Sequence, residues 1–562
     1  MAAAQIKVPE GFTLHTENTS HILLSANEAF LNPIQEFNRD LSVACIKTWS
    51  QLLHDTKHAK WLLARQKKQS SRAKKTEATD SLAEKPAKRP KLETETDEAG
   101  PSIPHASGSG GYTRRKIVIL EALSATGLRS IRYAKEIPYV SRVIANDLSP
   151  AAAEAIRRNV EVNGLKLPDV LPEGSRPVEI RVNEGDACTL MYSHRESKDR
   201  VEVVDLDPYG TAAPFIDAAV QCVVDDGLLC VTCTDLSILA TTNFPEKCFS
   251  NYGGIPTKSE YCHEAALRLV LHTVSSSAAR YGRYIEPLLS LSIDFYVRLF
   301  IRIRTAPIEV KRAVSKTSMY WICNDCQSFY GHQLAKVTEK AHPSGPVNLN
   351  FKTQAGPPVG ETCPECNGVL HVAGPMWSAP LHNQEFVAKV LEHVESGENT
   401  YGTSTRMKGM LTVAKEELSD DLFYFTPAKI SKFFHCVTPS FSDIASALLH
   451  AGHKVSRSHA SAGSIKTSAT RSEVLDIFRN WVKLHPVKNT ASPTSPGQRL
   501  LAKEPKIDAN FERHPDVSLH TVKIVRYQEP PPNWGPKAKA GPTPTAPAKR
   551  KHVQLEDLEE QE

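Results

Sequence analysis

The chain has 562 residues, of which 40% are hydrophobic and 23% charged, and its formal net charge at pH 7 is +5. This length allows about three to four domains, and the composition is ordinary for a soluble globular protein. No apolar run approaches the roughly 18 residues of a membrane helix, so no membrane span is expected, and the small positive excess permits an anionic partner without demanding one.

Three stretches of the chain are nearly free of large apolar residues. They run from about 65 to 111, around 488–497, and from Tyr527 to the last residue. Such segments bury too little apolar surface to offset the entropy lost on ordering. We therefore expect them to be disordered.

Between residues 116 and 304 the pattern alternates between short apolar runs and helical spacing. Strands are predicted at 116–123, 142–146, 178–182, 201–206 and 227–232, with helices at 127–137 and 150–163. This alternation is typical of βαβ units in a parallel sheet with right-handed crossovers. Two further strands, 287–296 and 297–304, are predicted to form an antiparallel pair that closes the sheet.

The C-terminal third follows a different pattern. A helical region is predicted from Asn383, followed by short helices at 427–436 and 441–451. Strands at 454–459 and 464–468 would form a two-stranded wing, and a helix is predicted at 473–484. This order indicates a winged-helix-like α+β module.

Carboxylates follow the predicted strands of the sheet at the edge where open α/β sheets bind ligands. The G-x-G-x-x-G fingerprint of dinucleotide enzymes is absent, and several carboxylates would repel a phosphate. S-adenosylmethionine fits better: Asp147 could accept both ribose hydroxyls, Asp186 the adenine amine, and the Ala187 N–H could meet an adenine nitrogen. Arg129 could hold the carboxylate of the cofactor. Any one of these acids alone could equally be a structural loop residue.

Asp207-Pro208-Tyr209 follows the fourth predicted strand of the sheet. It is similar to the [Asp/Asn]-Pro-Pro-[Tyr/Phe] motif of methyltransferases that act on exocyclic base amines, although it has one proline instead of two. A carboxylate that accepts an N–H hydrogen bond localises the lone pair of a weakly nucleophilic aryl amine, and the aromatic ring can stack on the base. The alternative is an ordinary type I turn with Asp at its first position.

The twelve cysteines are informative through their spacing. Eight are scattered, several of them in apolar runs such as 221–234, which indicates buried thiols in a reducing compartment. The other four form two C-x-x-C pairs, Cys323 with Cys326 and Cys363 with Cys366. We expect a structural Zn²⁺ site with a long loop projecting between the pairs; two redox or unpaired motifs are the alternative.

Basic residues occur in two groups that could contact phosphates, although a solvated surface would look the same. They are Arg298, Arg302, Arg304, Lys311 and Arg312 near the sheet, and Arg406, Lys408, Arg457, Lys466 and Arg471 in the C-terminal part. His459 could be an RNA contact or a wing residue. Basic clusters at 85–91 and 549–551 are weak signals for a nuclear import receptor.

Six motifs together resemble the tRNA (guanine-26-N2)-dimethyltransferase family in its eukaryotic form. They lie at 30–40, 120–132, 145–149, 205–210, 261–264 and 456–468. The resemblance covers nearly all of the chain outside the three stretches expected to be disordered. It implies a Rossmann-like class I methyltransferase fold of the α/β class, with the Cys₄ zinc insert and the winged-helix-like domain added to it.

The resemblance also implies a role for each matching residue. Arg39, Arg129, Asp147, Asp186 and Ala187 match the cofactor contacts of the family, and Asp207 matches its catalytic carboxylate. Phe30 and Tyr209 match the two aromatic residues that sandwich the flipped guanine, with Tyr where the family has Phe. Without the resemblance, Phe30 would be interpreted as a core residue of an amphipathic helix. The four cysteines match zinc ligands.

The expected function is the transfer of two methyl groups from S-adenosylmethionine to N2 of guanine-26 in tRNA. The expected location is the nucleus, and the existence of a mitochondrial pool stays open. There are two alternatives. One is an RNA-binding or RNA-refolding factor with an ancillary methyltransferase fold, and the other is a methyltransferase for adenine N6 or a protein amine. The product's degree of methylation, the tRNAs chosen and the oligomeric state stay open.

The chain is expected to divide into six segments. They are 1–64, which completes the active site; 65–112, a disordered basic insert; 113–318, the methyltransferase domain; 319–375, the zinc-binding insert; 376–487, a tRNA-binding domain; and 488–562, a mostly disordered tail.

Overall fold

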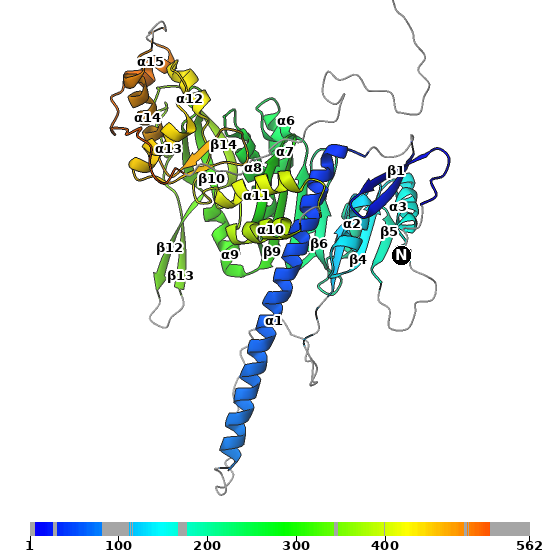
Figure 1. Cartoon of the computed structure of the whole chain (residues 1–562). Coiled ribbons are helices and arrows are strands. Elements are labelled where there is room, and N and C mark those ends of the chain that lie inside the picture. The colour runs from blue at the N-terminus through cyan, green and yellow to red at the C-terminus, as the bar shows by residue number, and fades with distance from the viewer. Residues whose placement is uncertain are drawn as a thin grey trace, which may run out of the picture.

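A computed structural model describes residues 6–25, 31–80, 112, 114, 116–166, 177–341, 347–397, 400–487, 492 and 494–517. Its centre is a seven-stranded sheet in the order β5-β4-β3-β6-β7-β9-β8 (Figure 1). Neighbouring strands from β5 to β7 are parallel, whereas β9 runs antiparallel to both β7 and β8. The strands are β3 (Ile117–Glu121), β4 (Val140–Asp147), β5 (Glu179–Glu184), β6 (Val201–Leu206), β7 (Val223–Cys233), β8 (Arg283–Ile293) and β9 (Tyr296–Thr305). The predicted parallel sheet with an antiparallel closing pair is confirmed.

Helices cover both faces of this sheet, because alternate residues of each strand point to opposite sides. On β7, Leu229 packs in one core with α5 and α8, and Leu228 packs in a second core with α1, α10 and α11. The helices around the sheet are α2 (Leu128–Glu136), α3 (Pro150–Val162), α4 (Ala187–Ser193), α5 (Ala213–Cys222), α6 (Leu236–Leu239), α7 (Pro245–Tyr252), α8 (Cys262–Ala279), α10 (Gln384–Ser396) and α11 (Ser404–Glu416). We expected α10 and α11 to belong to the C-terminal module, but their apolar faces pack in the second core of the catalytic sheet.

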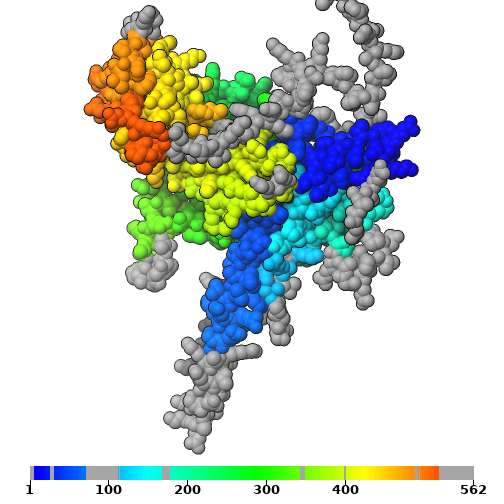
Figure 2. Space-filling model, in the orientation of Figure 1, coloured from blue at the N-terminus to red at the C-terminus, as the bar shows by residue number. Residues whose placement is uncertain are grey.

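The N-terminal segment forms a hairpin, β1 (Phe12–Glu17) and β2 (Ser20–Ser25), and then η1 (Pro33–Gln35) and the long helix α1 (Glu36–Asp80). The first turns of α1 are buried against the sheet, and the helix then leaves the body (Figures 1 and 2). The expectation of disorder from residue 65 is therefore wrong for residues 65–80. This stretch contains no Gly or Pro and is rich in Arg, Lys, Gln and Ala, which have high intrinsic helix propensity.

The cysteine-bearing insert contains two small sheets. After α9 (Pro307–Arg312) and η2 (Ala313–Lys316), strands β11 (Phe329–Gln333), β10 (Thr317–Cys323) and β14 (Leu370–Trp377) form a three-stranded sheet. Between the two cysteine pairs, β12 (Ala335–Ala341) and β13 (Val347–Thr353) form a separate ribbon that projects from the body (Figure 1). The predicted projection between the pairs is thus a regular β-ribbon.

The C-terminal module has the predicted order of two helices, a small hairpin and a helix. It consists of α12 (Pro427–Phe434), α13 (Phe441–His450), β15 (Val455–Arg457), β16 (Ile465–Thr467), α14 (Arg471–Leu484) and α15 (Pro496–Leu501). Leu500 of α15 is buried in the core of this module, so the tail beyond residue 487 is in part ordered. Among the described helices, none has the length and apolar character needed to cross a membrane.

Candidate active site

The loop between β3 and α2 forms a tight turn at the carboxyl edge of the sheet. Ala125 has a φ of +48°, and its N–H donates to Asp147 Oδ2 at 2.9 Å. Gly127 has a φ of +76°, and a Cβ there would lie 2.9 Å from Ile156 Cγ2. Only glycine avoids both the backbone strain and this contact. Asp147 therefore holds the loop that leads from β3 into α2.

Asn146 ties together the ends of three neighbouring strands. Its Nδ2 donates to the carbonyl oxygens of Ala122 at 2.9 Å and Gly185 at 3.1 Å, and its Oδ1 accepts from Asn183 at 2.7 Å. The Gly185 N–H donates in turn to the carbonyl oxygen of Asp147 at 3.0 Å. These bonds place the β4–α3 turn, which carries Asp147, beside the β5–α4 turn, which carries Asp186. This role of Asn146 was not predicted from the sequence.

Asp147 and Asp186 also have local structural roles. Asp147 Oδ1 accepts the N–H of Ser149 at 2.9 Å, and Asp186 caps α4 by accepting the N–H of Thr189 at 2.7 Å. Ala187 is the first residue of α4 and is buried. The amides of a first helical turn have no partner within the helix, so the Ala187 N–H is a donor available to a ligand.

The Asp207-Pro208-Tyr209 segment leaves β6 in a turn that is fastened to the end of β7. The N–H of Gly210 donates to Thr234 Oγ1 at 2.8 Å, and the N–H of Thr234 donates to the carbonyl oxygen of Gly210 at 2.8 Å. Pro208 is buried, whereas Tyr209 is 85% exposed. An aromatic ring that is held outside the core by an anchored turn is free to stack on a base.

Arg129 contacts the carboxylate of Asp207. Its other terminal nitrogen donates to Ser42 Oγ of α1 at 2.9 Å, and its Nε lies 3.7 Å from Glu121 Oε1 and 3.8 Å from Asp205 Oδ2. The Arg129 side chain is 5% exposed, so its charge is compensated inside the protein by these three acids. The structure thus brings together a predicted cofactor contact and the predicted catalytic acid.

A second ion pair, between Arg298 and Asp205, lies next to the pair of Arg129 and Asp207. Arg298 donates to Asp205 Oδ1 at 2.8 Å and to Ser42 Oγ at 2.8 Å, and both charged side chains are fully buried. The expectation that Arg298 reaches a phosphate is therefore wrong. Neither Asp205 nor Ser42 was predicted from the sequence to take part in these contacts. Both side chains support the arginine that holds Asp207.

Arg39 lies in a separate ionic cluster between the N-terminal hairpin and α1. Its Nε donates to Glu17 Oε2 at 2.7 Å, and it is almost fully buried. Burial raises the pKa of Glu17, but hydrogen bonds from His15 and Arg39 lower it by a larger amount. The resulting pKa is about 2. A cofactor contact by Arg39 stays a prediction. Phe30 lies outside the described residues.

Comparison with known proteins decides the family. The model of the N2,N2-dimethylguanosine tRNA methyltransferase family matches residues 5–479. The chain belongs to this family. It is 43% identical to the tRNA (guanine(26)-N(2))-dimethyltransferase of Schizosaccharomyces pombe, over 94% of this chain and 92% of that protein. It is 40% identical to the Homo sapiens protein of that name, over 94% and 78% of the two chains.

The fold of the family also appears in a solved structure, Trm1 from Pyrococcus horikoshii in complex with S-adenosyl-L-methionine. That structure is 23% identical, covers 83% of this chain and 99% of its own, and superposes with a TM-score of 0.59. It supports the fold of this family member.

In this member of the dimethyltransferase family, several basic residues that we expected to reach phosphates are neutralised within the protein. Arg406 pairs with Asp294 at 2.7 Å and Arg471 with Glu260 at 2.7 Å, and all four are largely buried. Lys466 lies 3.2 Å from Glu417, with both side chains buried. The prediction for Lys466 is therefore wrong. Arg406 and Arg471 each line a pocket, so phosphate contacts by these two residues stay predictions.

The remaining basic candidates differ in their surroundings. Arg302 and Arg304 share Glu286 at 3.3 and 2.9 Å, and Arg312 lies 2.8 Å from Glu339. Lys311, Lys408 and Arg457 stay predictions. His459 is buried and its Nδ1 lies 2.6 Å from Glu417 Oε2, so it joins the wing to the body.

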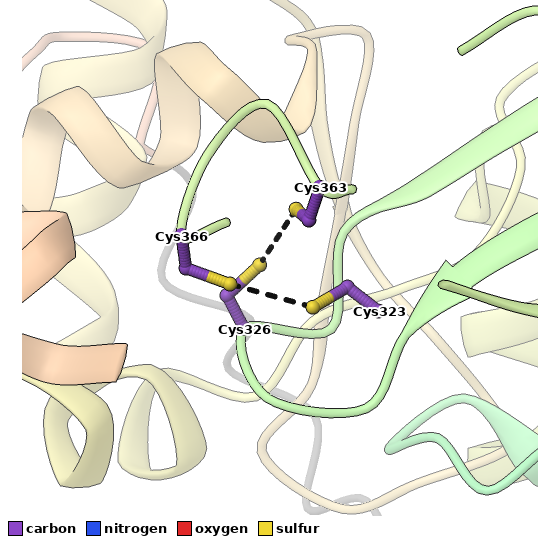
Figure 3. Close-up of side chains that lie close together, drawn as sticks. All are labelled: Cys323, Cys326, Cys363 and Cys366. Atoms are coloured by element: carbon purple, nitrogen blue, oxygen red, sulfur yellow. Dashed lines mark hydrogen bonds between the residues drawn. The ribbon is translucent and has the colours of Figure 1, made fainter. Parts of the chain in front are cut away.

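The four predicted metal ligands of the family member converge (Figure 3). Cys323 Sγ lies 3.4 Å from Cys366 Sγ, Cys326 Sγ lies 3.6 Å from Cys363 Sγ, and all four sulfur atoms lie within 4.8 Å of one another. Four sulfur atoms at about 2.3 Å from one Zn²⁺ would be about 3.8 Å apart, which is close to these separations. No disulfide joins the described cysteines, and the four thiols are buried. The set fits a closed structural zinc site.

Proposed function

We propose that this protein transfers two methyl groups from S-adenosylmethionine to the exocyclic N2 of guanine-26 in tRNA. One observation carries the proposal: the Asp207 carboxylate lies at the edge of the sheet where Asp147 and Asp186 also lie, next to a largely exposed aromatic ring, in a chain of the dimethylguanosine family. The names of the curated relatives support the tRNA and the guanine-26 position.

The residues that we propose to bind the cofactor offer hydrogen-bond donors and acceptors at that edge of the sheet. Each oxygen of Asp147 accepts one backbone N–H and has a further lone pair for a ribose hydroxyl. Asp186 would accept the adenine amine, and the N–H of Ala187 would donate to the adenine ring. Arg129 has five N–H donors, so it can bind the cofactor carboxylate while it stays beside Asp207. Arg39 belongs to the same proposal through the family resemblance.

The chemistry at the guanine follows from the Asp207-Pro208-Tyr209 turn. S-adenosylmethionine supplies an electrophilic methyl group. Tyr209 would stack on the extruded base, with Phe30 on its other face, and this stacking offsets part of the cost of base flipping. Asp207 would accept one N–H of the amine and the adjacent backbone carbonyl the other. As the C–N bond forms and the C–S bond breaks, the surplus proton of N2 passes to Asp207 and then to water, and a second cycle uses the remaining N–H.

We further infer that one Zn²⁺ ion binds the four cysteines and has a structural role. The zinc site would connect the insert to the C-terminal module, because the cysteines share a core with Phe425, Ile430 and Phe434. Nuclear residence with a mitochondrial pool is also proposed. The basic clusters that support import lie outside the described residues, and a relative from Saccharomyces cerevisiae, 40% identical over 94% of this chain, carries the word mitochondrial in its name.

The decisive experiment incubates the purified protein with methyl-labelled S-adenosylmethionine and unmodified tRNA and analyses the nucleosides. We expect N2,N2-dimethylguanosine at one position, and loss of at least a hundredfold in rate for Asp207→Asn with cofactor affinity nearly intact. Asp199→Asn, an exposed acid in the turn before β6, is the matched control. A wild-type protein that binds tRNA without transferring methyl groups would instead favour the RNA-refolding alternative.

A further inference from the structure

The ribbon of β12 and β13 has two faces of different chemistry. Its register pairs Lys336 with Lys352, Thr338 with Asn350, and Lys340 with Asn348. Since alternate residues of a strand share a side, these six residues form one face, which we call the polar face. The opposite face carries Val337, Leu349 and Phe351, which are half-buried, together with Glu339.

The positive charge of the polar face has no acid to balance it on that face. Lys336, Lys340 and Lys352 are exposed, and none of them is in an ion pair found among the described residues. Lys336 and Lys352 lie directly opposite each other, and like charges in that position destabilise a strand pair. The acid of the ribbon, Glu339, lies on the other face and binds Arg312 at 2.8 Å. An anionic partner would relieve this repulsion.

The base of the ribbon is firmly held. Its strands begin and end between the two cysteine pairs, whose sulfur atoms are buried, and Ala335 at the start of β12 is also buried. Arg471 of α14 donates to the carbonyl oxygen of Cys326 at 3.2 Å, and Arg499 donates to that of Cys366 at 3.2 Å. The ribbon therefore projects from a supported base (Figure 1). The three lysines of its polar face are exposed.

We propose that the polar face of the ribbon binds the sugar–phosphate backbone of the tRNA at a distance from the methylated base. The inference rests on the proposed function, which supplies the tRNA. Lysines bind phosphates as point charges, and Thr and Asn side chains bond to phosphate and ribose oxygens. The face has no aromatic residue for base stacking and no arginine for bidentate base recognition. The contribution of this face to tRNA affinity is therefore independent of the nucleotide sequence and sensitive to salt.

The test removes the charge and keeps the fold. The variant K336Q/K340Q/K352Q is compared with K116Q/K166Q/K198Q, which removes three exposed lysines around the catalytic sheet, outside the ribbon and the C-terminal module. The dissociation constant for unmodified tRNA is measured over a series of salt concentrations, and kcat at saturating tRNA. For the ribbon variant we expect affinity about tenfold weaker, and a slope of log K against log [salt] reduced by about one per lysine. Its kcat, cofactor affinity and unfolding midpoint should match those of the wild type.

Two outcomes would overturn the inference. One is a ribbon variant whose tRNA affinity and salt slope equal those of the control variant. The other is loss of tRNA affinity for V337T/L349T but not for the lysine variant, which would assign binding to the opposite face and to an apolar, protein-like contact. Either result leaves the proposed function intact when the wild type still methylates tRNA. A wild type that methylates no tRNA contradicts the proposed function itself.

Discussion

The guanidinium of Arg129 contacts the carboxylate of Asp207, although the two residues follow different strands of the sheet. Arg129 is the second residue of α2, the helix after β3, and Asp207 follows β6, which pairs directly with β3. The residue proposed to hold the cofactor carboxylate is thus the residue that orients the proposed catalytic acid. Loss of the Arg129 guanidinium should therefore both displace Asp207 and weaken cofactor binding.

The first prediction concerns this arginine. Arg129→Lys replaces a planar fork that reaches Asp207, Ser42 and nearby acids with a single point charge. We expect a rate at least tenfold lower and weaker cofactor binding, measured by single-turnover kinetics and calorimetry, since small displacements of reacting groups are costly. Arg142→Lys is the control, because Arg142 is exposed on β4. An unchanged rate for Arg129→Lys would show that Asp207 needs no support from this side chain.

The second prediction separates the two roles of Asp186. Serine retains the helix cap of α4, and alanine removes it at a cost of about 1 kcal/mol in stability. Neither residue offers a carboxylate to the adenine amine, so both Asp186→Ser and Asp186→Ala should weaken cofactor binding about tenfold or more. Thermal unfolding and equilibrium binding measure the two effects. Cofactor affinity at the wild-type level in Asp186→Ser would leave this residue with the capping role alone.

The third prediction tests the exposed ring. Tyr209→Ala should lower kcat/KM for tRNA by about five- to 150-fold, which corresponds to ~1–3 kcal/mol of base stacking. Tyr209→Phe keeps the ring and should retain the wild-type value. The unfolding midpoint should not change, because the Tyr209 side chain is 85% exposed. Equal kcat/KM values for the alanine and phenylalanine variants would argue against stacking.

The fourth prediction concerns pH and the buried Glu121. Burial raises its pKa from 4.5 to about 7, against the lowering effects of Arg129 and of hydrogen bonds from Ser124 and Ser130. Between these two values the folded protein binds more protons than the unfolded chain, so the stability from this group is present at low pH and is lost as pH rises through about 7.

The comparison for Glu121 is with Glu121→Gln, whose side chain does not titrate. We expect the free energy of unfolding of the wild type, relative to this variant, to fall by about 3 kcal/mol between pH 4.5 and pH 8. Denaturant titrations at several pH values measure it, with Glu154→Gln, exposed on α3, as the control. A difference that stays constant with pH would mean that Glu121 does not titrate in this range.

The fifth prediction concerns the metal. Elemental analysis should find one zinc ion per chain, and Cys363→Ser with Cys366→Ser should abolish its binding. The C-terminal module should lose stability with the metal, because the four cysteines lie in its core. Cys436→Ser alters a half-buried thiol outside the two pairs and should keep the zinc. Full zinc occupancy in the double variant would exclude these ligands.

The sequence alone was sufficient to place the elements of the sheet, the acids at its edge and the two cysteine pairs. Each of these is a local signal. Buried parallel strands are short apolar runs, their carboxyl ends share one edge, and a C-x-x-C pair supplies two ligands within one turn. The Asp207-Pro208-Tyr209 turn and the wing of the C-terminal module were predicted for the same reason, since hydrophobic periodicity and turn-forming residues are local features of the sequence.

Only the tertiary structure decided which charges meet. Ser42 lies far along the chain from Arg129 and Arg298, yet it bonds to both, and Arg298 is buried against Asp205 and does not face a phosphate. A charged side chain looks the same in the sequence whether it is solvated or paired. The ion pairs form because the packing of α1 on the sheet brings distant segments into contact and removes water between them, and no local pattern encodes that packing.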